Sequence, residues 1–191
     1  MSRLKLTQRP GTGKVVNVTP ENAGWKYVGF DLHKLNKGDA ASEKSDGDET
    51  CLVFISGKGK VTAGGKDLGE LGERMSVFEG KPWSVYLPAG VEWKVEAITD
   101  VELAVCRAPS INGDLPVRVI GPDDLGLETR GKGSNVRHVI NILPEGGTHA
   151  SHIHPRTSQE IIAMIKIHTN LGVITLELDH ARAPATAANF L

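Results

Sequence analysis

The chain has 191 residues, enough for one domain of ordinary size and part of a second. A formal net charge of -1 gives no reason to expect nucleic acid or an anionic membrane as a partner, and no stretch approaches the ~20 apolar residues that span a membrane. The first residues lack the apolar core of a secretory signal, so we expect a cytoplasmic protein that handles a small molecule. Cys51 and Cys106 lie in apolar runs and are expected to fill space in the core.

Short strands separated by glycine turns are predicted between residues 25 and 108. Residues 25–35 alternate apolar and polar side chains, the period of a half-buried strand, and we expect His33 to be solvated on its polar side. Residues 40–49 are small or charged and predict a solvated loop, whose acidic run 43–49 is not expected to be a cation site. Further strands are predicted at residues 51–56, 60–63, 75–78, 83–87, 92–97 and 101–108.

Turns that recur about every 8 to 12 residues favour an all-β sandwich or barrel of antiparallel strands. A further strand is predicted at residues 114–120, and residues 131–143 predict a glycine-rich loop and a strand that leads toward another domain. Trp25, Trp83 and Trp93 could stack on a sugar inside such a barrel, but positions in the core are favoured.

Histidines gather after residue 144. His152 and His154 are two residues apart and would share one face of a strand. With Glu160 they form a set that could bind zinc, iron or manganese, although we favour an exposed linker that happens to carry histidines. Arg137 could hold a substrate carboxylate through two parallel hydrogen bonds, with a salt bridge between domains as the favoured alternative.

Five segments resemble, in the same order, the N-terminal half of the 5-deoxy-glucuronate isomerase family. Members of that family are cupins with two barrels that serve myo-inositol catabolism, a part of carbohydrate metabolism. The segments are Gly24-Trp-Lys-Tyr-Val-Gly-Phe, Cys51-Leu-Val-Phe-Ile-Ser-Gly, Val77-Phe-Glu-Gly-Lys-Pro, Tyr86-Leu-Pro-Ala-Gly and Gly131-Lys-Gly-Ser-Asn-Val-Arg-His-Val-Ile-Asn-Ile-Leu.

The resemblance implies a cupin-type antiparallel barrel and an isomerase that converts an aldehyde sugar acid into a 2-keto acid. It also implies a divalent metal (zinc, manganese or iron) in the full enzyme, and it is compatible with a homo-oligomer. In cupins generally a His-x-His pair, a glutamate and a later histidine hold the metal, but Trp93 stands at the last of these places and no histidine precedes Glu49 in its loop. The N-terminal barrel is therefore expected to bind no metal. His152, His154 and Glu160 are the candidate ligands, with a spacing that departs from the family.

Residues 164–191 resemble the start of a bacterial cyclophilin-type peptidyl-prolyl isomerase, with a hairpin and the opening of a helix. We expect three parts: a cupin-like barrel with its connection at 1–144, a linker that carries histidines at 145–163, and a truncated hairpin with a helix start at 164–191. The favoured function is a truncated 5-deoxy-glucuronate isomerase, whether active or inactive alone. A catalytically silent cupin module that dimerises or binds a ligand is the alternative, and a prolyl isomerase fragment is a weaker one.

Overall fold

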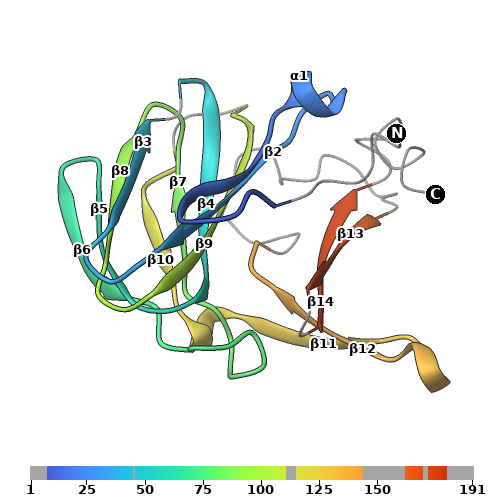
Figure 1. The fold of residues 1–191 in the computed structure, drawn as a ribbon. Helices are drawn as coiled ribbons and strands as arrows, with labels where there is room; N and C mark the ends of the chain where they lie inside the picture. The colour runs from blue at the N-terminus through green and yellow to red at the C-terminus, as the bar shows by residue number, and fades with distance from the viewer. Residues whose placement is uncertain (1–7, 45, 111–114, 144–161, 170–171, 180–191) are drawn as a thin grey trace.

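The computed structural model describes residues 8–44, 46–110, 115–143, 162–169 and 172–179 of the chain. Two antiparallel sheets stand face to face in Figure 1, one with six strands in the order β1-β2-β9-β4-β7-β10 and one with four in the order β3-β8-β5-β6. The only α-helix of these residues is α1 (Pro20–Ala23). The all-β sandwich or barrel predicted from the spacing of the turns is confirmed.

The strands of the larger sheet are β1 (Gly13–Val18), β2 (Gly29–Leu35), β4 (Asp48–Ser56), β7 (Ser84–Leu87), β9 (Val101–Pro109) and β10 (Arg118–Ile120). Those of the smaller sheet are β3 (Ala40–Lys44), β5 (Gly59–Ala63), β6 (Lys66–Leu71) and β8 (Glu92–Ala97). Two 3-10 turns follow the barrel, η1 (Pro122–Asp124) and η2 (Gly133–Asn135). Two pairs of strands complete the described chain, β11 (Gly126–Arg130) with β12 (Arg137–Asn141), and β13 (Ile162–Thr169) with β14 (Gly172–Asp179).

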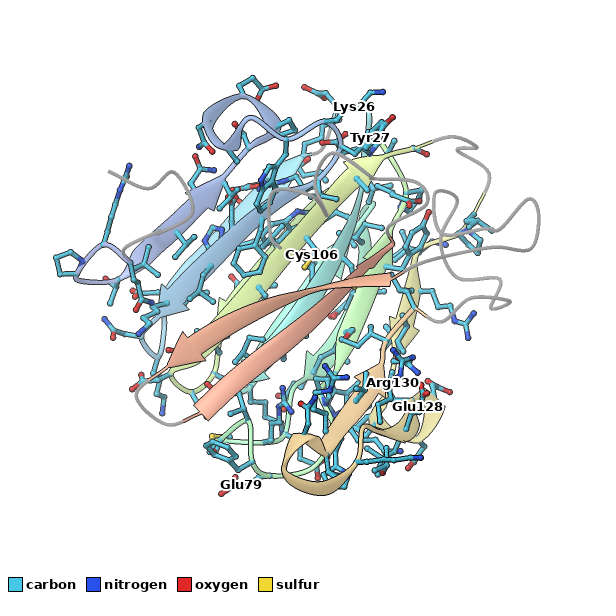
Figure 2. The ribbon with its side chains drawn as sticks, turned by 90° about the vertical axis from the view of Figure 1, so that its right-hand side faces the viewer. Lys26, Tyr27, Glu79, Cys106, Glu128 and Arg130 are labelled. Carbon is cyan, nitrogen blue, oxygen red and sulfur yellow. The ribbon has the colours of Figure 1, made fainter. Side chains whose placement is uncertain are left out.

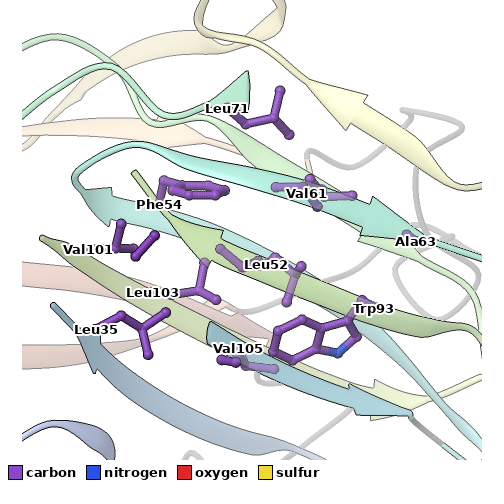
Figure 3. Close-up of a cluster of buried hydrophobic side chains, with 14 of the residues drawn as sticks. Leu35, Leu52, Phe54, Val61, Ala63, Leu71, Trp93, Val101, Leu103 and Val105 are labelled. Carbon is purple, nitrogen blue, oxygen red and sulfur yellow. The ribbon is translucent and has the colours of Figure 1, made fainter. Parts of the chain in front are cut away.

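The main core lies between the two sheets and follows from the alternation of side chains along each strand. On β8, Trp93, Val95 and Ala97 are buried while the residues between them are exposed. All three belong to one apolar cluster with side chains of the facing sheet, and Figure 3 shows Trp93 of this cluster together with Leu52 and Leu103. Cys106 lies on the opposite, outer face of the six-stranded sheet (Figure 2), in a separate small cluster with Cys51. Both thiols are free, as expected for cysteines that fill space.

Three local predictions are wrong. Residues 40–44 were expected in a loop but form β3, because β8 supplies hydrogen bonds that small and charged side chains alone would not indicate. Residues 66–71 form the strand β6, which was not predicted because the glycines in and around this segment indicated turns. Residues 75–78 were expected to be a strand but form a loop in which Met75 and Phe78 are exposed.

The strand pairs after the barrel lie to one side of the two sheets in Figure 1. β13 and β14 pair with each other over their whole length, so the hairpin expected near residue 164 is present. The expected linker at 145–163 and the expected helix start lie almost wholly outside the described residues, and the division into three parts stays a prediction. Within the described ranges, no helix is long and apolar enough to cross a membrane.

Gly57 and Gly65 offer a matched test of how tightly the turns pack against the barrel. Both have positive φ, +88° and +74°, but a Cβ at Gly57 would clash with the carbonyl oxygen of Asp100 while a Cβ at Gly65 meets nothing within 4 Å. We expect Gly65→Ala to lower the free energy of unfolding by about 1 kcal/mol. Gly57→Ala should cost at least about 2 kcal/mol more, measured by urea denaturation. Equal costs would show that the Gly57 turn can move aside.

Candidate functional site

Five charged or titratable side chains meet between the two sheets, and we call them the barrel cluster: Lys14, Asp31, His33, Glu43 and Arg107. Asp31 and His33 are two residues apart on β2 and therefore point to the same, inward face. Glu43 comes from β3 of the opposite sheet, and Arg107 from β9, beside β2. Lys14 pairs with His33 in the β1–β2 register, next to a β-bulge that turns the strand.

Two cations and two carboxylates of the cluster neutralise one another. The Asp31 carboxylate is fully buried and accepts hydrogen bonds from Asn17 Nδ2 at 2.7 Å and from Arg107, and its Oδ2 lies 2.7 Å from Lys14 Nζ. Glu43 lies 2.5 Å from Lys14 Nζ through Oε1 and accepts a hydrogen bond from Arg107 at 2.6 Å through Oε2. Every carboxylate oxygen of the cluster therefore has a partner.

The imidazole of His33, in contrast, has a buried ring nitrogen without a hydrogen-bond partner. The residue is 5% exposed, and its ring meets Trp93 edge to face at 6.3 Å between centroids. The Nε2 atom lies 3.7 Å from Glu43 Oε1, too far for a hydrogen bond, and has no hydrogen-bond partner within the described part of the chain. A buried polar atom without a partner costs about 1–3 kcal/mol, so it calls for an explanation.

Burial and neighbouring charge set the protonation of the cluster. Burial lowers the pKa of His33, and this outweighs the attraction of the Glu43 carboxylate, so the imidazole is neutral near pH 7. Burial would raise the pKa of Asp31, but hydrogen bonds from Arg107, Lys14 and Asn17 outweigh it and the pKa is lowered. The pKa of Glu43 is lowered by the same balance of effects. Both carboxylates are therefore ionised.

A neutral imidazole and two carboxylates are a donor set that suits a divalent transition metal. One ligand atom from each of Asp31, His33 and Glu43 lies within 4.8 Å of the others. The two carboxylates, however, already bind Lys14 and Arg107, and a dication beside these two cations would be repelled. With Lys14 and Arg107 bound to both carboxylates, the cluster does not fit a metal.

The cluster is largely buried. Its most exposed side chain is Lys14, at 35%, while the Asp31 side chain is completely buried. Two hollows on the described surface, of about 520 and 400 Å³, contain none of the five cluster residues in their linings. The arrangement can hold charge and tie the two sheets together, and its carboxylates have no oxygen left without a partner.

Two expectations for the residues of this cluster are wrong. His33 was expected to be solvated, but it faces the barrel interior, because polar side chains occupy the inward positions of β2 where apolar ones were assumed. Glu43 was assigned to a solvated loop, but it lies on β3 and pairs with Lys14 and Arg107. The alternation Asp31-Leu-His33 was the available signal. That the barrel binds no metal stays a prediction.

The remaining predicted site residues lie elsewhere. Arg137 is on β12, opposite Arg130 of β11, outside the barrel cluster. Glu49, near the expected carboxylate position, is buried and accepts a hydrogen bond from Tyr86 at 2.8 Å. Trp93 is 1% exposed, as predicted for a core residue. Trp25 and Trp83 are half-buried, and His152, His154 and Glu160 lie outside the described residues.

The two facing antiparallel sheets, with side chains filling the space between them, define a cupin-type barrel protein. The model of the KduI/IolB family matches residues 3–154, and the chain belongs to this family. The crystal structure of an IolB-like protein from Salmonella typhimurium LT2 superposes with a TM-score of 0.71 at 41% identity, covering 84% of this chain and 57% of the other.

Relatives of known activity point the same way. The 5-deoxy-glucuronate isomerase of Geobacillus kaustophilus is 47% identical over 148 residues, which cover 76% of this chain and 53% of the relative. That of Geobacillus thermodenitrificans is 46% identical over 134 residues, covering 70% of this chain and 48% of the relative. The chain thus spans about half the length of the curated relatives that it matches.

Removing Arg107 should cost far more than removing an exposed cation. Arg107→Met leaves Asp31, which is fully buried, and Glu43 with one cation fewer. We expect a loss of about 3 kcal/mol in the free energy of unfolding. The control Lys60→Met breaks the exposed ion pair between Lys60 and Asp67, 3.0 Å long, and should leave the free energy of unfolding nearly unchanged, because water screens an exposed pair. Similar values for both variants, measured by urea denaturation, would show that the cluster is solvated.

Acid should destabilise the barrel in two steps. The pKa of His33 is lower in the folded than in the unfolded state, so unfolding takes up a proton and stability falls as pH drops below about 6.5. The lowered pKa values of Asp31 and Glu43 give stability that is present above about pH 4 and lost below it, as pH falls through the folded values. His33→Asn should flatten the first step in urea denaturation at pH 7.5, 6 and 5. An unchanged slope would contradict the assignment.

Proposed function

We propose that this chain acts in the conversion of 5-deoxy-glucuronate to its 2-keto isomer, as the N-terminal barrel of a 5-deoxy-glucuronate isomerase. The observation that carries the proposal is the 47% identity with the Geobacillus kaustophilus enzyme over 148 residues. The substrate is a small sugar acid, and the proposed compartment is the cytoplasm.

The reaction fixes what the site must contain. An aldose-to-ketose shift needs a base that removes the proton alpha to the carbonyl, and groups that stabilise the charge that develops on the oxygens. A divalent metal, when bound, supplies the second of these. We assign its binding to His152, His154 and Glu160, and the substrate carboxylate to Arg137, because imidazole and carboxylate side chains bind such ions and guanidinium forks onto carboxylates.

A second candidate is a silent cupin module that dimerises or binds a small acid. Its support is that both carboxylates of the barrel cluster are already paired with Lys14 and Arg107. Exposed apolar side chains, Leu127 and Val136, occur on and between the strands after the barrel. This candidate predicts a defined oligomer and ligand binding without turnover.

Turnover of 5-deoxy-glucuronate, followed by NMR with added zinc, manganese or iron, tests the first candidate. We expect conversion that a chelator abolishes and that the pair His152→Ala with His154→Ala reduces at least about 100-fold in kcat/KM. Arg137→Lys should raise KM about tenfold with kcat little changed, because lysine cannot form the two parallel hydrogen bonds.

The control for these variants is Lys60→Met, which alters only an exposed ion pair and should leave kcat and KM unchanged. No conversion with any of the three metals would reject activity for this chain. A stable dimer by mass measurement, or a sugar acid that raises the melting temperature, would then favour the silent module.

A further inference from the structure

The loop between β6 and β7, residues 72–83, borders a surface hollow of about 400 Å³. Pockets that hold small ligands have volumes of about 300–1,000 Å³, so the hollow is large enough for one. Residues 77–82 of this loop are among the segments that resemble the isomerase family, but the proposed reaction gives them no role. The lining comes from this loop and from η1, and consists of Glu73, Arg74, Glu79, Gly80, Lys81 and Pro122.

The guanidinium of Arg74 is half-buried, and none of the described carboxylates pairs with it. Its Nε donates a hydrogen bond to the carbonyl oxygen of Ile55 at 2.9 Å, and its Nη1 donates one to that of Gly80 at 3.3 Å. Burial lowers the pKa of Arg74, and no neighbouring carboxylate raises it again. Buried cations are normally paired with an anion. The positive charge and the N–H groups of Nη2 are therefore available to an anionic ligand.

Lys81 adds a second cation to the same hollow. Its Nζ donates a hydrogen bond to the carbonyl oxygen of Leu125 at 2.7 Å, which holds the ammonium in place without neutralising it. The two carboxylates of the lining, Glu73 and Glu79, belong to exposed residues, and neither forms a salt bridge with Arg74 or Lys81 in the described part of the chain. Glu79 lies at the outer edge of the molecule in Figure 2 and accepts a hydrogen bond from the backbone N–H of Met75 at 3.2 Å.

We propose that Arg74 and Lys81 form a binding site for the carboxylate of a small organic acid. Guanidinium and ammonium groups bind carboxylates through charge-assisted hydrogen bonds. Phosphate suits the same donors, but it would bring a second negative charge close to Glu73 and Glu79, so the lining favours an anion with a single charge. The site is separate from Arg137 on β12 and does not depend on the proposed reaction, because it is defined by binding alone.

NMR of the backbone amides, with D-glucuronate added at constant ionic strength, tests the proposal without any measurement of turnover. D-Glucose lacks the carboxylate and serves with inorganic phosphate as a comparison. We expect saturable shifts at residues 73–81 with glucuronate, none with glucose, and binding of phosphate that is at least about threefold weaker. Arg74→Gln should weaken glucuronate binding about tenfold and Lys81→Met about threefold. Lys60→Met, which removes a lysine from an exposed ion pair, should bind like the parent.

An exchange of opposite sign separates a binding role from a structural one. Glu73→Gln should tighten glucuronate binding about twofold, because it removes a negative charge that repels the ligand. Glu92→Gln removes the same charge from an exposed position on β8 that does not line the hollow, and it should bind like the parent. A role of Arg74 limited to holding the loop would leave both variants alike, and that result would overturn the proposal.

Arg74→Gln also loses the hydrogen bonds to Ile55 and Gly80, so circular dichroism checks the fold of each variant. If that variant unfolds, Lys81→Met and the Glu73→Gln exchange still decide. Three results would overturn the proposal: glucuronate that causes no saturable shift at residues 73–81, glucose that shifts these residues equally, and phosphate that binds more tightly than glucuronate. Shifts confined to β12 around Arg137 would overturn it as well.

Discussion

The barrel depends at one end on a single guanidinium group that binds a carboxylate from each sheet. Arg107 contacts Asp31 of the six-stranded sheet and Glu43 of the four-stranded sheet. Elsewhere the sheets are joined by apolar contacts, which are not directional. Buried charges are tolerated only when they are paired, so this contact fixes the position of β3 against β2 and β9 more narrowly than apolar packing would. Lys14 repeats the same bridge from β1.

The pairing of these carboxylates limits what the barrel can contribute to the proposed isomerase reaction. A catalytic carboxylate needs a lone pair directed at the substrate. The carboxylates of Asp31 and Glu43 instead accept hydrogen bonds from Arg107. Trp93, which is buried, packs edge to face against the His33 ring. The proposed function therefore gives the barrel a supporting role, with the chemistry assigned to residues after it.

Sequence patterns located most of the strands and failed where pairing decided the outcome. Strands β8, β4 and β9 can be recognised from the sequence. Burial on one face requires apolar and polar residues to alternate, as on β8, and burial on both faces requires a run of apolar residues, as on β4 and β9. β3 has no such pattern, since its small and charged residues form a strand only when β8 is beside them. The apolar residues of 75–78 misled in the opposite direction, because nothing in a local pattern distinguishes an exposed loop from a short strand.

The sequence by itself determined the all-β class, the place of Trp93 in the core and the relation to the 5-deoxy-glucuronate isomerases, because each depends on residue types in order along the chain. Only the tertiary structure decided that Asp31, His33 and Glu43 meet, and that Lys14 and Arg107 neutralise the two carboxylates. These residues are up to 93 positions apart and come from four strands in two sheets. Their contact depends on strand order and register, which hydrogen bonds between distant segments set. No local pattern records that information.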